Sequence, residues 1–232
     1  MIADGHLASM VTTATTWIIP VIFAVTFHEA AHGIVANQLG DDTALRAGRV
    51  TLNPIRHIDP LGTILLPALM IVARAPFLFG YAKPVPVNFG RLKPLRLGMV
   101  LVALAGPATN VLLAIISALL AYGLYLLPQS AMLWAAENIQ HSIVLNVVLC
   151  VFNMLPLPPL DGGRVAVGLL PRRLALPLAR LEPYGMMILM GLFLLSYIGP
   201  QIGLGFNLLG WLIGGPTDLL YSFVLTITGH RS

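Results

Sequence analysis

The feature that most constrains the fold is a succession of six long apolar runs. They lie at about 11–39, 61–80, 97–127, 139–157, 184–199 and 203–228. Hydrophobic residues make up 57% of the 232 residues and charged residues only 9%, against roughly 25% charged in a soluble domain. A bilayer-spanning helix needs about 20 apolar residues. The sequence therefore predicts an all-α polytopic membrane protein, with a single integral membrane domain over 1–232.

Basic residues cluster in three loops beside these runs. They are Arg46, Arg49 and Arg56 before the second run, Lys83, Arg91, Lys93 and Arg96 after it, and Arg164, Arg172, Arg173 and Arg180 before the fifth. Positive charge marks the cytoplasmic side of a membrane, so the second run, 61–80, is expected to enter and leave there as a re-entrant or interfacial hairpin. Its internal Pro67, Arg74 and Pro76 favour a broken segment, although an ordinary spanning helix is the alternative.

This topology has about five spanning helices, with the N-terminus outside and the loops 40–60 and 161–183 inside. The expected location is the cell (inner) membrane, with the lipid bilayer as a partner. The net charge of +4 does not indicate a nucleic-acid partner, because the basic residues are confined to loops beside apolar runs. The sequence makes no prediction of oligomeric state.

The first run carries the motif "HEAAH" at 28–32, near its inner end. Ionisable residues at membrane depth are costly and mark functional sites. A helix places positions i and i+4 on one face, so His28 and His32 can hold one zinc ion while Glu29 reaches a water beside it. The alternative is a pair of histidines bonded to the backbone or to each other. If the helix ends near Leu39, His28 lies about 16 Å inside it, within reach of cytoplasmic water.

A catalytic zinc site usually has three protein ligands, and Asp161 is the candidate for the third. It closes the stretch "NMLPLPPLDGGR" (153–164) at the cytoplasmic end of the fourth run, on the same membrane face as the histidines. The prolines stop a regular helix, while Gly162 and Gly163 permit close backbone approach. The alternative for Asp161 is a helix cap or a turn.

Several stretches together match a known family. They are "HEAAH", "LNPIRHIDPLGTILLP" (52–67), "YAKPVPVN" (81–88), "AGPATN" (105–110) and "NMLPLPPLDGGR". With these the chain resembles the site-2 protease family of intramembrane zinc metalloproteases, in the compact bacterial form without a PDZ domain. The resemblance covers most of residues 20–165. It places the catalytic core at about 11–165 and leaves the C-terminal helices, about 184–228, without a family motif.

The resemblance implies roles for five residues. His28, His32 and Asp161 would hold one Zn²⁺ per chain, Glu29 would be the general base, and Asn153 would lie near the substrate. The implied enzyme is a zinc metalloendopeptidase, active toward the cytoplasmic side, that hydrolyses a peptide bond within or near a transmembrane segment of single-span membrane proteins (regulated intramembrane proteolysis). The sequence does not name the substrate. A metal or proton transporter and a catalytically dead relative are the other classes, but no inverted repeat is visible and no motif residue is replaced.

A helical substrate must be locally unwound, and the family explanation is a strand that clamps it. We expect this short β element near the active site at "AGRVTLNP" (47–54), where Val50 and Leu52 alternate with polar residues. A surface turn is the alternative. The hairpin region 61–90 either gates substrate entry or packs passively.

Four further polar residues are left outside the catalytic set. Asn110 in "AGPATN" either hydrogen-bonds near the site or belongs to a stretch that serves only helix packing. His57 and Asp59 are expected in a solvated loop rather than beside the site. Asp218 follows the interruption Gly214-Gly215-Pro216 in the last run and is expected at an unwound point or an interface.

Overall fold

The computed structural model describes residues 2–72, 80–201, 203 and 207–230. Five helical stretches in this part of the chain are long and apolar enough to cross a membrane. They are Thr12–Gln38, Leu95–Leu126, Gln129–Asn153, Arg172–Gln201 and Leu208–Ile227. The prediction of an all-α membrane protein with about five spans is confirmed by these elements.

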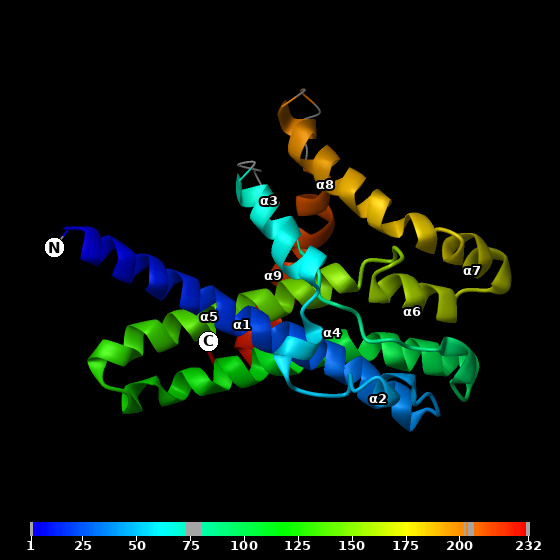
Figure 1. Ribbon diagram of the computed structural model, residues 1–232, viewed down its shortest axis with the longest axis horizontal. Helices are drawn as coiled ribbons and strands as arrows, with labels where there is room; N and C mark the ends of the chain where they lie inside the picture. The colour runs from blue at the N-terminus through cyan, green and yellow to red at the C-terminus, as the bar shows by residue number, and fades with distance from the viewer. Residues whose placement is uncertain (1, 73–79, 202, 204–206, 231–232) are drawn as a thin grey trace.

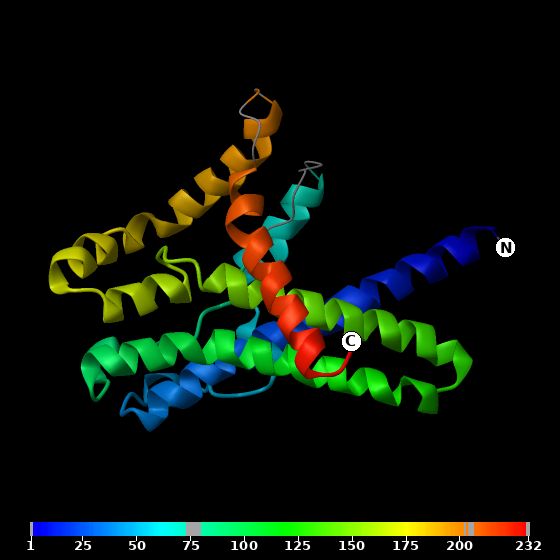
Figure 2. The ribbon, with the colours of Figure 1, turned by 180° about the vertical axis from the view of Figure 1, so that it is seen from behind.

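The helices of the described residues, in chain order, are α1 Ile2–Gln38, α2 Thr43–Arg46, α3 Leu66–Val72, α4 Leu95–Leu120, α5 Gln129–Asn153, α6 Asp161–Leu169, α7 Arg172–Ala179, α8 Gly185–Gln201 and α9 Leu208–Ile227. A π-helical turn covers Pro60–Leu65, and 3-10 helices cover Pro54–His57, Phe89–Arg91, Ala121–Leu126 and Glu182–Tyr184. In Figure 1, α1, α4 and α5 lie side by side along the longest axis, and α8 rises obliquely from α7. Figure 2, which shows the molecule from the back, has α9 crossing in front of the α4–α5 pair.

Small side chains let the central helices approach closely. Ala114 and Ala118 of α4 are fully buried against Val147 of α5, and Val224 of α9 joins the same cluster. In a bilayer, lipid tails are as apolar as leucine, so close backbone packing by small residues drives helix association. This contact places α9 against the α4–α5 pair. In the sequence, α9 lies outside the part of the chain that carries the family motifs.

In the described residues, the second apolar run forms a short, irregular helix. Its apolar helical part, Pro60–Met70, is too short to cross a bilayer as a straight helix. The chain then returns in an extended conformation, and the Tyr81 N–H donates to the Gly62 carbonyl at 3.1 Å. The two limbs therefore lie side by side at their base, as the predicted hairpin requires. Arg74 and Pro76 lie outside the described residues.

The predicted β element at 47–54 is not formed, and the described residues contain no strand. Gly48 turns the chain with φ +63°, a conformation that only glycine adopts readily. The Arg49 side chain is buried, and its guanidinium donates to the carbonyl oxygens of Arg56 and Lys83. A turn built around Arg49 therefore replaces the strand. This turn is the alternative that was stated for the stretch 47–54.

Candidate metal centre

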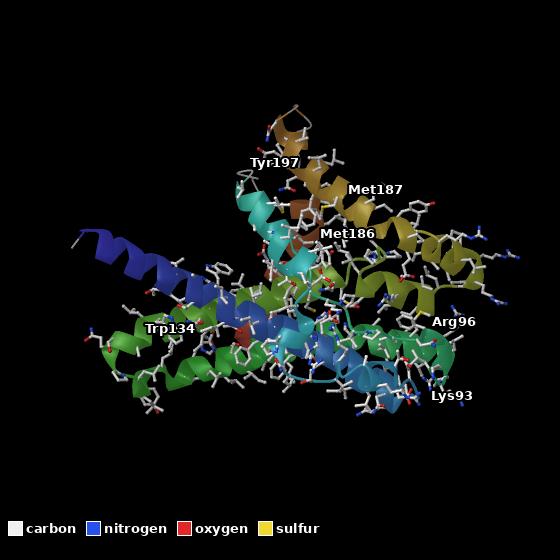
Figure 3. All side chains as sticks on the ribbon, in the orientation of Figure 1. Lys93, Arg96, Trp134, Met186, Met187 and Tyr197 are labelled. Atoms are coloured by element: carbon white, nitrogen blue, oxygen red, sulfur yellow. The ribbon has the colours of Figure 1, made fainter. Side chains whose placement is uncertain are left out.

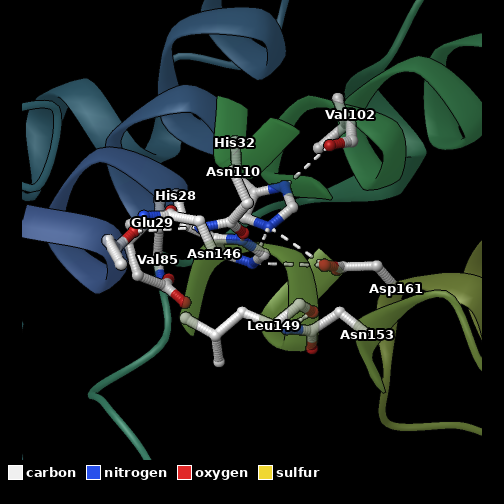
Figure 4. Close-up of polar contacts among 11 residues, drawn as sticks. His28, Glu29, His32, Val85, Val102, Asn110, Asn146, Leu149, Asn153 and Asp161 are labelled. Atoms are coloured by element: carbon white, nitrogen blue, oxygen red, sulfur yellow. Dashed lines mark hydrogen bonds and ion pairs between the residues drawn. The ribbon is translucent and has the colours of Figure 1, made fainter. Parts of the chain in front are cut away.

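Three buried side chains converge between α1, α4 and α6. His28 and His32 lie one turn apart on the same face of α1, and their Nε2 atoms are 3.1 Å apart. Asp161, the first residue of α6, places its Oδ2 3.2 Å from the Nε2 of His28 and 3.4 Å from that of His32 (Figure 4). The structure thus brings together the three residues that the sequence proposed as a ligand set.

Hydrogen bonds at the far side of each imidazole determine where its lone pair points. His32 Nδ1 lies 2.7 Å from the carbonyl oxygen of Val102, which can only accept, so Nδ1 carries the proton. His28 Nδ1 lies 2.6 Å from Oδ1 of Asn110 and donates in the same way. Both Nε2 atoms are therefore free to bind a cation. A second hydrogen bond of this kind is typical of histidines that bind metals.

The donor set fits a zinc ion. Asp161 Oδ2 is buried and has no hydrogen-bond partner among the described residues. A tetrahedral zinc ion with bonds of about 2.05 Å separates its ligand atoms by about 3.3 Å, and the three observed separations are 3.1, 3.2 and 3.4 Å. Two imidazole nitrogens and one carboxylate oxygen are a ligand set that zinc takes in proteins.

Gly106 of α4 forms one wall of this cluster. A Cβ atom at position 106 would lie 2.5 Å from the Nε2 atoms of both His28 and His32, closer than carbon and nitrogen can approach. Only glycine leaves space for the imidazoles and for an ion between them. The stretch "AGPATN" thus provides close packing, as the sequence indicated, and the packing is against the imidazoles themselves.

Glu29 forms its hydrogen bond with the backbone and not with the three converging side chains. Its Oε2 accepts a hydrogen bond of 2.8 Å from the backbone N–H of Val85, in the extended stretch 80–88 that follows the hairpin (Figure 4). The Val85 side chain is buried and lies against α1 at Gly33, where an added Cβ would meet it at 3.3 Å. The carboxylate of Glu29 is therefore held beside the imidazoles by a backbone N–H, and no hydrogen bond to its other oxygen is described.

The loop before α6 explains how Asp161 reaches the histidines. A Cβ at Gly162 would lie 2.2 Å from the Met154 carbonyl oxygen, and one at Gly163 would lie 2.4 Å from the Pro158 nitrogen. Both glycines let the first turn of α6 fold back against the proline-rich loop that leaves α5. This is the close backbone approach that the sequence predicted for the pair.

The remaining sequence-predicted residues lie elsewhere. Asn153 ends α5, and its Nδ2 donates to the Leu149 carbonyl at 3.0 Å; none of its described hydrogen bonds reaches the histidines or Asp161. The expectation of a solvated His57 is wrong, because its side chain is buried and its Nε2 lies 2.9 Å from the Thr51 carbonyl oxygen. Asp218 is exposed on α9. Asn110, which was left outside the catalytic set, contacts His28. The one sequence feature that pointed to this contact was a polar amide inside an apolar run.

Known proteins are similar in sequence to this chain over most of its length. A protein described as "Putative zinc metalloprotease YwhC", from Bacillus subtilis, is 43% identical over 188 residues, which cover 76% of this chain and 78% of that protein. The chain belongs to the site-2 protease family. Rip2 of Mycobacterium tuberculosis carries the same zinc metalloprotease description and is 31% identical over 210 residues, which cover 90% of this chain and 73% of that protein.

A third relative, matched over a shorter stretch, is the putative zinc metalloprotease MJ0611 of Methanocaldococcus jannaschii, 34% identical over 139 residues, which cover 60% of this chain and 62% of that protein. No family model matches the chain. No solved structure matches it either. The relatives' descriptions name zinc as the metal, in agreement with the donor set at His28, His32 and Asp161.

Proposed function

We propose that this chain is an intramembrane zinc endopeptidase, which hydrolyses a peptide bond within or near a transmembrane segment of single-span membrane proteins. His28, His32 and Asp161 hold one Zn²⁺ per chain, and Glu29 is the general base. One observation carries the proposal. Two imidazole nitrogens and a carboxylate oxygen, each with a free lone pair, converge beside a glutamate inside a bundle of apolar helices.

The chemistry assigned to the chain's own residues follows from this arrangement. A zinc ion held there supplies a Lewis acid, which activates water and polarises the scissile carbonyl. Glu29 takes the proton of the attacking water and delivers it to the leaving amine as the carbon–nitrogen bond breaks. The Val85 N–H orients the Glu29 carboxylate, while Val102 and Asn110 orient the imidazoles. Asn153 is proposed to lie near the substrate carbonyl.

The orientation in the inner membrane is part of the proposal. In Figure 1, α2, α7 and the start of α4 gather at one end of the molecule. These elements carry basic residues, and Figure 3 shows Lys93 and Arg96 at this end, with Trp134 toward the opposite one. The positive-inside rule then puts this end in the cytoplasm, the N-terminus outside, and the metal centre toward the cytoplasmic side.

The test compares purified parent protein with Glu29→Gln in detergent, assaying both zinc content and cleavage of a panel of single-span membrane proteins. We expect equal zinc content and a loss of cleavage of about 10²- to 10⁴-fold, because the general base alone is removed. Glu137→Gln, at an exposed position on α5, is the control and should cut like the parent. Zinc-loaded parent protein that cuts no substrate would contradict the protease assignment, and a parent that binds no zinc would contradict the metal site.

A further inference from the structure

A chain of buried side-chain amides links His28 to α5. His28 Nδ1 contacts Asn110 Oδ1 at 2.6 Å, and Asn110 Nδ2 donates to Asn146 Oδ1 at 2.8 Å (Figure 4). Asn146 Nδ2 in turn donates to the backbone carbonyl of Ser142 at 2.8 Å. Asn110 is 0% exposed and Asn146 is 1% exposed, so water does not compete for these bonds. The chain therefore runs without a break from a backbone carbonyl of α5 to an imidazole of α1.

The direction of every bond in this chain is fixed by its α5 end. The Ser142 carbonyl can only accept, so Asn146 must turn its NH₂ group toward it and its oxygen toward Asn110. Asn110 must then present its NH₂ group to Asn146 and its oxygen to His28. That oxygen requires the proton of His28 on Nδ1, which leaves the lone pair of Nε2 pointing at Asp161.

The opposite orientation would disable the site. If the Asn110 amide were reversed, its NH₂ group would face Nδ1 of His28, and the imidazole would have to carry its proton on Nε2. That proton would occupy the space between His28, His32 and Asp161. The other contact of Asn110 Nδ2, with the Ala24 carbonyl, is 3.5 Å long and does little to exclude this arrangement, because an amide presents similar shapes in both orientations.

We propose that Asn146 is a positioning residue, which acts through Asn110 to hold His28 in the tautomer that binds the metal. The inference rests on the proposed metal site. Asn146 touches neither the histidines nor Asp161 by any described hydrogen bond, and its position seven residues before Asn153 lies outside the motif stretches.

The same helix supplies a matched control. Asn138 lies two turns before Asn146 on α5 and makes the same local bond, from its Nδ2 to the Trp134 carbonyl at 2.9 Å. Its Oδ1, however, has no hydrogen-bond partner among the described residues, whereas Asn146 Oδ1 accepts from Asn110. Loss of Asn138 removes an asparagine from α5 without touching the amide chain.

The experiment measures zinc affinity of the full-length protein in detergent by competition with a chelator. Asn146→Leu should weaken zinc binding by about 10- to 100-fold, the range found when an outer hydrogen-bond partner of a metal-binding histidine is lost. Asn138→Leu should bind like the parent. In an Asn110→Asp background, either carboxylate oxygen can accept from His28, so adding Asn146→Leu should cause no further loss.

A second readout reports the tautomer directly. Nitrogen-15 NMR of histidine-labelled, metal-free protein should show His28 protonated on Nδ1 in the parent and in Asn138→Leu, and a mixture of tautomers in Asn146→Leu. Asn146→Ala replaces Asn146→Leu if the latter does not fold, as judged by circular dichroism and gel filtration.

Each contrary outcome has a distinct meaning. Parent-like zinc affinity in Asn146→Leu, or an equal loss in both Asn110 backgrounds, would overturn the positioning role and leave the metal site standing. A parent that fails to bind zinc would instead remove the proposed function on which the inference rests.

Discussion

Gly106 of α4 faces the imidazoles of the metal centre without a side chain. Gly106→Ala would place a methyl group 2.5 Å from the Nε2 atoms of both histidines, so we expect at least a 10-fold loss of zinc affinity with the helical fold retained. Bound zinc per chain, measured by atomic absorption after dialysis against a chelator, checks this. Gly191→Ala on α8 is the control, because a Cβ there meets nothing within 4 Å. Parent-like zinc retention in Gly106→Ala would show that the ion does not lie between the imidazoles.

Asp41 ties the extended stretch 80–88 to the end of α1. Its carboxylate is fully buried and accepts from Thr43 and from the Asn88 N–H, the latter at 2.6 Å. Burial by itself raises the pKa of Asp41, but the hydrogen bonds from Thr43 and Asn88 outweigh it and leave the pKa below its usual value. The stabilisation is therefore complete above about pH 3.9 and is lost as the pH falls through the lowered pKa of the folded state.

Asp41→Asn should reveal this pH dependence. Above about pH 5 the parent should exceed the variant in free energy of unfolding by about 2 kcal/mol, because the variant amide satisfies the two N–H groups less well. The difference should shrink as the pH falls below about 4. Denaturant unfolding in detergent at a series of pH values measures it, and a difference that stays constant down to pH 3 would contradict the assignment.

The two histidines could be predicted because their spacing is local, whereas Asp161 was proposed from its shared membrane face and from the family resemblance. The i, i+4 separation fixes His28 and His32 on one helix face, and Gly162 and Gly163 mark a tight approach around Asp161. The contact of Asn110 with His28 could not be predicted in the same way. It depends on the rotation of α4 about its own axis relative to α1, which no local sequence pattern specifies.

Among the elements, the extended stretch 80–88 has an unusual anchor. Arg49 donates from one nitrogen to the Arg56 carbonyl and from another to the Lys83 carbonyl, the latter at 2.6 Å, and so holds the chain just before Val85. A lysine retains the charge at this position but lacks the planar fork that reaches two carbonyl groups at once.

Arg49→Lys should therefore loosen the N–H group that contacts Glu29. Hydrogen–deuterium exchange can report on the Val85 amide separately from its neighbours, because Pro84 and Pro86 have no N–H. We expect the Val85 amide to exchange about 10-fold faster, the equivalent of one hydrogen bond weakened by about 1.4 kcal/mol. Arg46→Lys, on an exposed ion pair with Asp42, should leave exchange unchanged. Equal exchange in Arg49→Lys and the parent would exclude an anchoring role.

Element boundaries were predicted less well than element number. The fourth apolar run was expected from about 139, but α5 begins at Gln129, because its first turns carry polar residues such as Ser130 and Glu137 that hydropathy alone does not assign to a helix. The loop 161–183 contains α6 and α7, which are too short to register as apolar runs. The strand at 47–54 failed because four alternating residues do not outweigh a glycine turn and a buried arginine.

At the scale of the whole molecule, the testable claim is the orientation in the membrane. Cys150 is the chain's only cysteine, so Cys150→Ala gives a cysteine-free background. In that background, Ser130→Cys should react with a membrane-impermeant thiol reagent added outside the cell, and Arg173→Cys should react only after the membrane is opened. Both positions are exposed at the surface. The reverse pattern of labelling would invert the proposed topology.

The three groups of the metal centre also come from segments made at very different times. His28 and His32 belong to α1, which is synthesised before α4 and α5, whereas Asp161 is synthesised after them. A nascent chain that has inserted α1 alone therefore offers two imidazoles and no carboxylate, which is a weaker site. The complete set of three donor groups therefore forms only after α6 has been made.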